Sequence, residues 1–361
     1  MSADRHRALV RLPPDGRGRT RVAVAERPAP RLDPGDVLLA PLVAGVCGTD
    51  WQILHGLRDD PSPVLGHEGT ARVVEPGTSG LRTGALVTVN PTHPDDPSFL
   101  LGHNLPGLWA ERTRIPASAV RAGLVLPVPD TARRPEVAAL AEPLASVLYG
   151  RDIALTAARP ASVVIWGDGV VGRLARKVWQ REVPAPRVLL VGRGTDATAP
   201  DDPRLPGLLA ELPSPVCALL ATWRTGTREA LTEVDRHIRG TLVADVHAGL
   251  AAGPVPLSCG EPDVAALRAD NCGGLPRQPL VHRFARPGGP LLLHGHRGVS
   301  RDHLERAVAL LSDAAFTTDD VLTHEVDLAG AAELINSVLA APRREADGRR
   351  VLKVAVRPGG A

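Results

Sequence analysis

Polar side chains that can bind a metal ion occur in three short segments of the first 150 residues. Cys47 and Asp50 lie in VCGTD, His67 and Glu68 lie in LGHEG, and Glu142 lies in LAEPL. A thiolate, an imidazole and a carboxylate are typical ligands of a catalytic zinc site, which keeps its fourth position open. The residue types therefore suggest Cys47, His67 and Glu142 as one ligand set.

Each of these residues also has an ordinary structural interpretation. A lone cysteine is usually a small core residue, and Glu142 alone could lie on the surface of a helix. No histidine next to Cys47 in the sequence supplies the base that a nucleophilic cysteine needs. The metal-site hypothesis therefore depends on Cys47, His67 and Glu142 meeting at one point in the fold.

A second kind of site is indicated by the segment VVIWGDGVVGRLARKVW, which places G-x-G-x-x-G between a strand-like and a helix-like run. Gly167 permits a tight turn, Gly169 lets the backbone approach a pyrophosphate, and Gly172 lets the helix pack on the strand. Val170 and Val171 complete the turn, where the start of a helix favours an anion. The pattern predicts a dinucleotide site, and the alternative is a glycine-rich turn without a ligand.

The second strand-like run of this region, RVLLVGRGTD, indicates which dinucleotide is bound. An acidic residue usually ends this strand and binds the ribose 2′-hydroxyl of NAD. Here the strand-like run ends in Gly192 and Arg193, and arginine binds phosphate in a bidentate manner. We therefore expect NADP(H) rather than NAD(H). In the alternative interpretation, Arg193 is a surface residue and Asp196 takes the acidic role.

The sequence falls into two parts that differ in their pattern of apolar runs and turn residues. Short strand-like runs between proline and glycine turns fill about the first 130 residues and predict a small antiparallel barrel or sandwich. From Ala161 onward, continuous apolar runs alternate with helix-like segments, which is typical of a doubly wound α/β domain. A closing strand-like run, RRVLKVAV, can return to the first domain, and the preceding APRREADGRR is expected to be a solvated loop.

Composition limits the class of protein. The 361 residues, 43% of them apolar, suffice for two packed domains, and a net charge of +2 argues against a general nucleic-acid binder. No apolar run approaches the roughly 18 residues of a membrane span, and the start lacks the apolar region of a secretory signal. Four cysteines without C-x-x-C spacing indicate a reduced, cytoplasmic protein.

Taken together, Cys-Gly-Thr-Asp, Gly-His-Glu and Glu-Pro-Leu ahead of the glycine turn resemble the zinc-dependent medium-chain dehydrogenase/reductases, which include alcohol, polyol and threonine dehydrogenases. The closing LTHEVDLAGAAELINSVL is also similar to that family, although the resemblance is diffuse between about Pro200 and Pro290. It implies an α/β fold with a GroES-like β-barrel catalytic domain over residues 1–152 and 297–361. A Rossmann domain with a doubly wound parallel sheet then covers residues 153–296. It also implies a homodimer or homotetramer, while the composition argues against nucleic-acid and membrane partners.

The resemblance assigns roles to the candidate residues. Cys47 and His67 would bind zinc with Glu142 as third ligand, while Glu68 would lie close by and exchange with water at the metal. Which of the two glutamates is the resting ligand stays open. Asp50 would accept a hydrogen bond from the ring of His67.

Further expectations concern proton transfer and the cofactor. By the resemblance, Thr49 would begin a proton relay from the substrate hydroxyl, and Lys353 would face the cofactor diphosphate. The relay histidine that often follows the Asp is replaced by Gln52, and His55 is by default a surface residue.

The family often carries a second, structural zinc held by four closely spaced cysteines. The corresponding stretch, NPTHPDDPSFLLGHNLPGLWAERTRIP, has no cysteine. We therefore expect one catalytic zinc, no structural zinc and a remodelled lobe, although His93 and His103 are present. His103, Asn104 and Trp109 could suit a hydroxylated or amino-substituted ring.

The resemblance implies an NAD(P)-dependent oxidoreductase that interconverts a secondary alcohol and a ketone. The cofactor would be held against the metal between the two domains. Suspected substrates are a polyol, a cyclitol or an amino sugar of secondary metabolism. Two alternatives are a zinc-free reductase of conjugated C=C bonds from the same superfamily and a non-catalytic nucleotide-binding protein on this fold.

Overall fold

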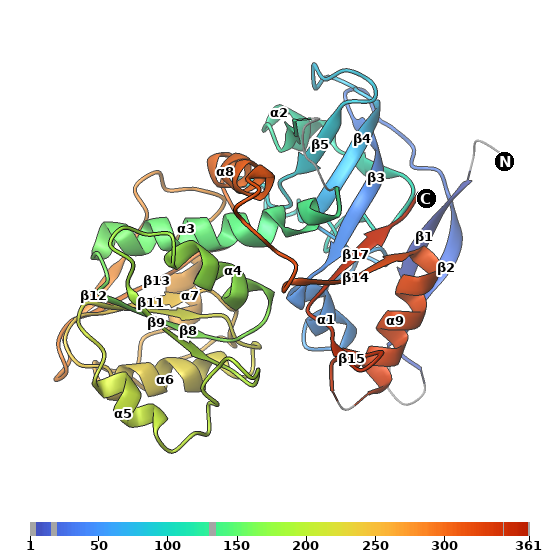
Figure 1. Cartoon of the computed structure of the whole chain (residues 1–361). Coiled ribbons are helices and arrows are strands. Elements are labelled where there is room, and N and C mark those ends of the chain that lie inside the picture. The colour runs from blue at the N-terminus through green and yellow to red at the C-terminus, as the bar shows by residue number, and fades with distance from the viewer. Residues whose placement is uncertain (1–4, 16–19, 130–134, 342, 360–361) are drawn as a thin grey trace. The chain divides into compact units, whose positions relative to one another are not determined.

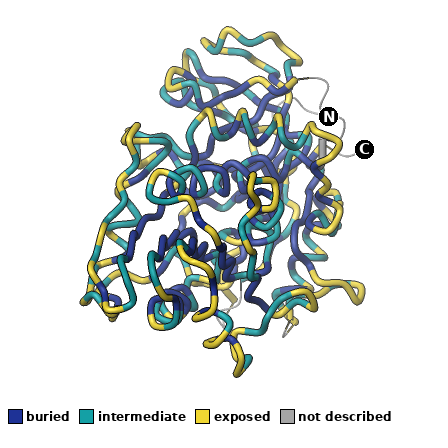
Figure 2. The backbone as a smooth tube through the Cα atoms, turned by 60° about the vertical axis from the view of Figure 1, so that its left-hand side comes forward, coloured by how far each residue is buried: buried dark blue, intermediate teal, exposed yellow. Residues whose placement is uncertain are grey.

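The computed structural model describes residues 5–15, 20–129, 135–341 and 343–359. The chain divides into two compact units (Figure 1), each with a hydrophobic core of its own. Unit 1 comprises Met1–Glu142 and Leu304–Ala361, and unit 2 comprises Pro143–His303. Figure 2 shows buried residues mainly in the interior and exposed residues mainly at the outer turns of the chain.

Unit 1 is built on a seven-stranded sheet that positions the metal-binding candidates. Strand β17 returns from the end of the chain and pairs antiparallel with β3, with Val354 opposite Val46. This register brings Lys353 next to the end of β3, where Cys47 follows. The prediction that the closing strand returns to the first domain is confirmed. The path of the sheet is β14 (Leu322–Asp327), β17 (Lys353–Arg357), β3 (Val37–Val46), β4 (Gly69–Glu75), β5 (Leu86–Val89) and β7 (Val125–Pro127), with β6 (Thr113–Ile115) pairing with β3.

A two-stranded ribbon and several helices complete unit 1. The ribbon joins β1 (Arg5–Arg11) to β2 (Val22–Pro28), and Asn336 of α9 (Leu328–Ala340) hydrogen-bonds both the N–H and the C=O of Val22. These bonds attach the C-terminal helix to the N-terminal ribbon. The remaining elements are α1 (Gly48–Leu54), α2 (Ala117–Arg121), the 3-10 helix η1 (Pro135–Leu140), and the short strands β15 (Glu345–Ala346) and β16 (Arg349–Arg350). Helix α8 (Arg301–Ser312) begins in unit 2 and ends in unit 1.

Unit 2 contains a six-stranded sheet in the order β12-β13-β11-β10-β8-β9, in which all neighbours except β12 and β13 run parallel. Four of the five parallel strands, β8, β10, β11 and β13, have only buried residues, as their continuous apolar runs predict. The strands are β8 (Ser162–Trp166), β9 (Arg187–Val191), β10 (Val216–Leu220), β11 (Leu242–Val246), β12 (His282–Phe284) and β13 (Leu291–Gly295), and the helices are α3 (Ala141–Ala157, which starts in unit 1), α4 (Val170–Trp179), α5 (Leu205–Ala210), α6 (Thr227–His237) and α7 (Val264–Ala269).

The order of these strands creates a switch point. From β8 the chain passes through α4 to β9 on one side, and it then returns to β10 on the other side of β8. In open α/β sheets, ligands bind at the carboxyl ends of the strands beside such a point. The predicted doubly wound domain is confirmed, and its carboxyl edge is the expected cofactor edge.

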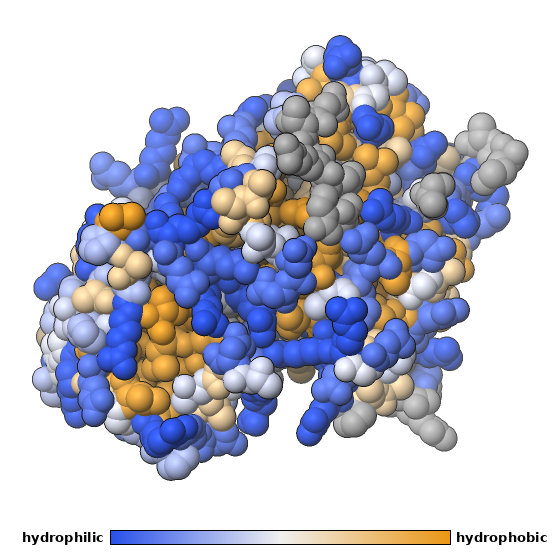
Figure 3. Space-filling model, in the orientation of Figure 1, coloured by the Kyte–Doolittle hydropathy of each residue, from blue (hydrophilic) through white to orange (hydrophobic). Residues whose placement is uncertain are grey.

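One face of the molecule and the lengths of its helices bear on membrane contact. Figure 3 shows hydrophilic residues over most of one face, with apolar patches between them. Within the described ranges, no helix combines the length and apolar character needed to cross a bilayer.

Candidate active site

Cys47 sits at the junction of β3 and α1, where the extended strand turns into a helix. Its backbone has φ −89° and ψ 162°, and its N–H donates to the Asp50 carboxylate at 2.8 Å. An acidic residue in the first helical turn satisfies a backbone donor that the helix leaves free. The VCGTD segment is thus a helix start that holds the half-buried Cys47 side chain at the end of the strand.

Two glycines bracket His67 and Glu68 and allow the close packing that positions them. Gly66 has φ +87°, and a Cβ there would collide with the indole of Trp109. Gly69 has φ +154°, and a Cβ there would collide with the carbonyl oxygen of Val43 in β3. The two glycines therefore allow close packing on both sides of His67 and Glu68, against Trp109 on one side and β3 on the other.

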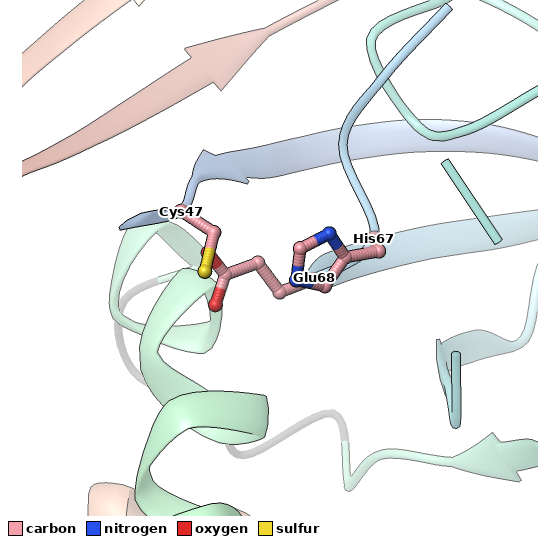
Figure 4. A group of neighbouring side chains, drawn as sticks. All are labelled: Cys47, His67 and Glu68. Atoms are coloured by element: carbon pink, nitrogen blue, oxygen red, sulfur yellow. The ribbon is translucent and has the colours of Figure 1, made fainter. Parts of the chain in front are cut away.

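Cys47, His67 and Glu68 converge (Figure 4). One ligand atom from each lies within 4.8 Å of the other two, and no other group of His, Cys, Asp and Glu among the described residues meets this criterion. His67 Nδ1 and Glu68 Oε2 are buried without a hydrogen-bond partner. A thiolate, an imidazole and a carboxylate with such unused atoms fit a zinc ion with one open position.

Glu142 is not part of this group, although it lies in the same unit at the start of α3. It is near enough to act electrostatically on Cys47: burial is the largest cause that raises the pKa of that thiol, followed by Glu68 and, more weakly, by Glu142. The structure thus brings together two of the three predicted ligands and puts Glu68 in the third place. The ligand role of Glu142 stays a prediction.

Thr49 and Asp50 lie beside the cluster as the sequence suggested. The hydroxyl oxygen of Thr49 is 3.9 Å from the sulfur of Cys47. An oxygen of the fully buried Asp50 carboxylate is 3.8 Å from His67 Nδ1, which is longer than a hydrogen bond. The predicted orientation of the His67 ring by Asp50 would therefore require a small approach of the two groups.

His103 adds a second imidazole next to the cluster. Its ring centroid is 4.9 Å from that of His67, and its Nδ1 is 3.4 Å from an oxygen of Asp60. Burial raises the pKa of Asp60, but His103 and Arg58 outweigh it and hold that pKa well below its usual range. Burial lowers the pKa of His103 itself. By contrast, His55 is exposed.

Lys353 contacts the cluster rather than open solvent. Its ammonium group and a carboxylate oxygen of Glu68 form an ion pair in which both side chains are at most 1% exposed. The register of β17 against β3 explains this contact, because it places residue 353 beside Cys47. The proposed contact of Lys353 with a cofactor diphosphate stays a prediction.

The cofactor turn in unit 2 has the geometry that its glycines predict. Gly167 follows β8 with φ +122°, and Gly169 caps α4, the helix that Val170 and Val171 begin. A Cβ at Gly172 would collide with the carbonyl oxygen of Gly167, whereas a Cβ at Gly169 would meet nothing within 4 Å. Gly172 therefore serves packing, and the open space at Gly169 fits the approach of a diphosphate.

Asp168, inside this turn, occupies the position next to the end of β9. Its carboxylate accepts a hydrogen bond of 2.6 Å from the N–H of Gly194, and a Cβ at Gly192 would lie 2.5 Å from the Asp168 side chain. Arg193 is 75% exposed and lies 3.8 Å from Asp201. Asp196, the alternative acidic residue, pairs instead with arginines of α4.

Comparisons with known proteins agree with this arrangement. The family described as alcohol dehydrogenase GroES-like domain matches residues 33–130, which include Cys47, His67 and Glu68. Glucose 1-dehydrogenase from Thermoproteus tenax is 31% identical over 210 residues, covering 52% of this chain and 57% of that protein. L-threonine 3-dehydrogenase from Pyrococcus horikoshii is 29% identical over 175 residues, covering 42% and 47%. The chain thus matches about half the length of these curated relatives.

The fold agrees over nearly the whole chain. Galactitol-1-phosphate dehydrogenase from Escherichia coli superposes with a TM-score of 0.69 at 17% identity, covering 98% of this chain and 100% of that one. Residues 33–130 thus match the alcohol dehydrogenase GroES-like family, and the whole chain shares the fold of that dehydrogenase. The predicted fold, a GroES-like β-barrel domain combined with a Rossmann domain, is confirmed.

One residue near the candidate site, Arg344, was not anticipated from the sequence. The segment APRREADGRR was expected to be a solvated loop, but Arg344 lies over the ring of Trp51 at 4.6 Å and donates to the carbonyl oxygen of Leu352 at 2.7 Å. Burial lowers the pKa of its guanidinium to about 9. The mixed charges of this segment give no indication that one of its arginines packs on a core tryptophan.

The suggestion that Trp109 lines a substrate pocket is wrong. Trp109 is 1% exposed in the core of unit 1, and its ring N–H donates to the carbonyl oxygen of Gly45 at 3.1 Å. The exposed Asn104 donates to the carbonyl oxygens of Pro97 and Ser98. Of the three, only His103 lies beside the metal-binding candidates.

Proposed function

We propose that this protein is a zinc-dependent oxidoreductase that transfers hydride between a nicotinamide cofactor and a secondary alcohol or ketone. The convergence of Cys47, His67 and Glu68 carries this proposal, because a metal-ligand set of this type is not needed for a zinc-free reductase. The glycine turn at the carboxyl edge of unit 2 supports the cofactor. When bound, zinc would supply Lewis acidity toward the substrate oxygen.

The residues of unit 1 have separate tasks in this proposal. Cys47, His67 and Glu68 would hold the metal, and Glu68 rather than Glu142 would be the resting third ligand because its carboxylate already lies in the cluster. Thr49 would take the proton of the substrate hydroxyl, since its own hydroxyl lies beside the Cys47 sulfur. Asp50 would fix the ring orientation of His67.

The third ligand can be tested by zinc content. Glu68→Gln should lower the zinc bound per chain after dialysis, whereas Glu142→Gln should retain zinc near the wild-type level. Elemental analysis of protein purified without added zinc gives the measurement. Zinc loss in Glu142→Gln but not in Glu68→Gln would assign the ligand role to Glu142. A wild-type protein without zinc would contradict the proposed zinc-dependent mechanism.

A polyol, a cyclitol or an amino sugar is the proposed substrate class. Support comes from relatives and structural neighbours named for hydroxylated substrates, namely glucose, threonine and galactitol 1-phosphate. A panel of sugars, cyclitols, amino sugars and simple secondary alcohols, each followed at the nicotinamide absorbance band, tests it. Turnover of simple alcohols alone would contradict this class, and turnover only of conjugated C=C substrates would favour the reductase alternative.

NADP(H) is the proposed cofactor, because Gly192 follows β9 where a carboxylate is usual, and the neighbouring Arg193 has a mostly exposed side chain that can bind a 2′-phosphate. Asp168 is the one feature that favours NAD(H), since its carboxylate lies against Gly192. Binding of NADPH and NADH to the wild type and to Arg193→Ala decides between them. Tighter NADH binding, or no loss of NADPH affinity in the variant, would overturn the NADP(H) assignment.

A further inference from the structure

The cysteine-free stretch of unit 1, residues 90–116, packs directly against the backbone that carries His67. Three of its consecutive N–H groups donate to carbonyl oxygens just before His67, namely Gly107 to Val64 at 2.8 Å, Leu108 to Gly66 at 2.7 Å and Trp109 to Leu65 at 3.2 Å. A Cβ at Gly102 or at Gly107 would lie 2.9 Å or less from backbone atoms of Gly66. The stretch therefore has no gap between itself and the segment from which His67 projects.

His103 is the side chain of this stretch that contacts the ring of His67. The two ring centroids are 4.9 Å apart and the ring planes are inclined by 35°. This separation lies in the range of favourable contacts between aromatic rings. Both residues are buried, with exposures of 7% for His103 and 5% for His67. The ring of His67 thus has a second ring packed against it.

His103 is itself held on two sides. Its carbonyl oxygen accepts from the N–H of Ser62 at 2.7 Å, and its own N–H donates to the carbonyl oxygen of Leu100 at 3.1 Å. Its Nδ1 lies 3.4 Å from Oδ1 of Asp60, and Arg58 fixes that carboxylate with two bonds of 2.9 and 3.1 Å. The position of the His103 ring is therefore set by its surroundings.

The ring of His67 lacks the hydrogen bond that usually orients a metal-binding imidazole. Among the described residues, its Nδ1 has no hydrogen-bond partner, and the nearest Asp50 oxygen is 3.8 Å away. Gly66 and Gly69 position the backbone on either side of His67, but they do not restrict rotation about its side-chain bonds. The contact with His103 is placed to restrict that rotation.

We propose that His103 is a positioning residue that orients the ring of His67 for metal binding. The inference rests on the proposed function, since it requires that Cys47, His67 and Glu68 hold zinc. A ring that is already restricted loses less conformational freedom when it binds. Loss of a group that orients a metal ligand usually lowers metal affinity by about 10–100-fold. The stretch without cysteines would thus support the catalytic metal site instead of holding a metal of its own.

A merely structural role for His103 predicts a different result. If its ring only fills space in unit 1, its replacement lowers the stability of the metal-free protein but leaves the zinc affinity of the folded protein unchanged. If its ring orients His67, loss of the ring lowers zinc affinity and accelerates zinc release. A substituted side chain that is also a ring should then preserve the affinity.

Three substitutions distinguish the ring of His103 from its nitrogen atoms. His103→Ala removes both, His103→Gln keeps a donor toward Asp60 without a ring, and His103→Phe keeps a ring without nitrogen. His103→Phe should fold, because the Asp60 carboxylate retains its two bonds from Arg58. His93→Ala is the matched control, since His93 lies in the same stretch and its ring contacts Phe99 instead of a metal-ligand candidate.

The experiment measures the dissociation constant and the release rate of zinc on the full chain by competition with a chelator. His103→Ala and His103→Gln should each raise the dissociation constant about tenfold or more, whereas His103→Phe and His93→Ala should leave it nearly unchanged. In cobalt-substituted protein, the visible absorption bands report ligand geometry. They should shift in the Ala and Gln variants of His103 and stay in place in the Phe variant. Urea denaturation of the metal-free protein shows which variants fold.

Three results would overturn the inference. They are an unchanged zinc affinity in a folded His103→Ala or His103→Gln variant, a loss in His103→Phe as large as that in those variants, and an equal loss in the His93→Ala control. If His103→Ala does not fold, His103→Gln and His103→Phe give the decision. Failure of the proposed function looks different, because the wild type would then bind no zinc, and the inference would fall with it.

Discussion

At the scale of single residues, the candidate site depends on side chains that are buried and charged together. Lys353 and Glu68 form an ion pair with almost no exposure, directly beside the Cys47 sulfur. Removing one partner of such a pair leaves an uncompensated buried charge, which is far more destabilising than removing both. The glycines around His67 are equally specific, because one of them admits an indole ring where a Cβ would stand.

Substitution of Lys353 measures this ion pair. Lys353→Met should lower the free energy of unfolding by about 3–5 kcal/mol because Glu68 keeps a buried, unpaired charge. Combining it with Glu68→Gln should restore part of that loss. Urea denaturation gives the values, and Lys177→Met, which removes the only other lysine, should change stability by less than about 1 kcal/mol. Equal losses at the two lysines would argue against the ion pair.

Substitution of two glycines with positive φ distinguishes the stability cost of backbone strain from that of a steric collision. Gly66 has φ +87° and faces Trp109, whereas Gly80 has φ +72° and faces open space. Gly80→Ala should cost about 1 kcal/mol from backbone strain alone. Gly66→Ala should cost at least about 2 kcal/mol more and should also reduce zinc content, since His67 must move. Similar losses of stability with full zinc would show that Trp109 yields without disturbing His67.

At the scale of elements, helix starts and strand ends carry the functional groups. Cys47 ends β3 and starts α1, and the glycine turn ends β8 and starts α4. Backbone donors and acceptors are left free at such places, so polar side chains can serve structure and function together. The same principle applies at α2, where the Asp36 carboxylate accepts a hydrogen bond from the N–H of Ala117, the first residue of the helix.

Asp36 gives a pH-dependent contribution to stability. Its carboxylate accepts from the N–H groups of Asp33 and Ala117, each at 2.8 Å, and pairs with Arg114. Burial raises its pKa, but these bonds outweigh that effect and lower the pKa below the usual value. A lowered pKa means that the stabilisation is complete above the unfolded-state pKa of about 4 and is lost as the pH falls further.

Asp36→Asn tests this contribution. The variant should be less stable than the wild type by about 1–3 kcal/mol at pH 7, and the difference should shrink below about pH 4. Urea denaturation across this pH range measures it. A difference that stays constant with pH would assign the effect to packing instead of charge.

Substitution of two glycines in the turn after β8 distinguishes a role in packing from a role in cofactor binding. Gly169→Ala should fold with nearly wild-type stability, because its Cβ meets nothing within 4 Å, yet it should weaken cofactor binding by about tenfold or more. Gly172→Ala should destabilise unit 2 itself, because its Cβ collides with the Gly167 carbonyl. Thermal unfolding and cofactor titration distinguish the two. Unchanged affinity in Gly169→Ala would place the diphosphate elsewhere.

At the scale of the whole molecule, the two compact units should respond to different ligands. The metal-binding cluster lies in unit 1, whereas the glycine turn lies in unit 2. A ligand stabilises the part of the structure that binds it. Hydrogen exchange should show that NADPH protects mainly residues 143–303, and that a zinc chelator deprotects mainly residues around 47 and 67. Protection by NADPH confined to unit 1 would contradict the assignment of the cofactor site.

Local patterns in the sequence determined the division into two differently built parts and the glycine turn, whereas Cys47 and His67 were grouped through the resemblance to a known family. Such features depend on backbone conformation and hydrophobic period, which neighbouring residues encode. Only the tertiary structure decided that Lys353, which lies 285 residues from Glu68, pairs with it, and that Asp245 meets His294. These contacts depend on which strands are neighbours and in what register, and a slip of one residue would turn each side chain to the opposite face.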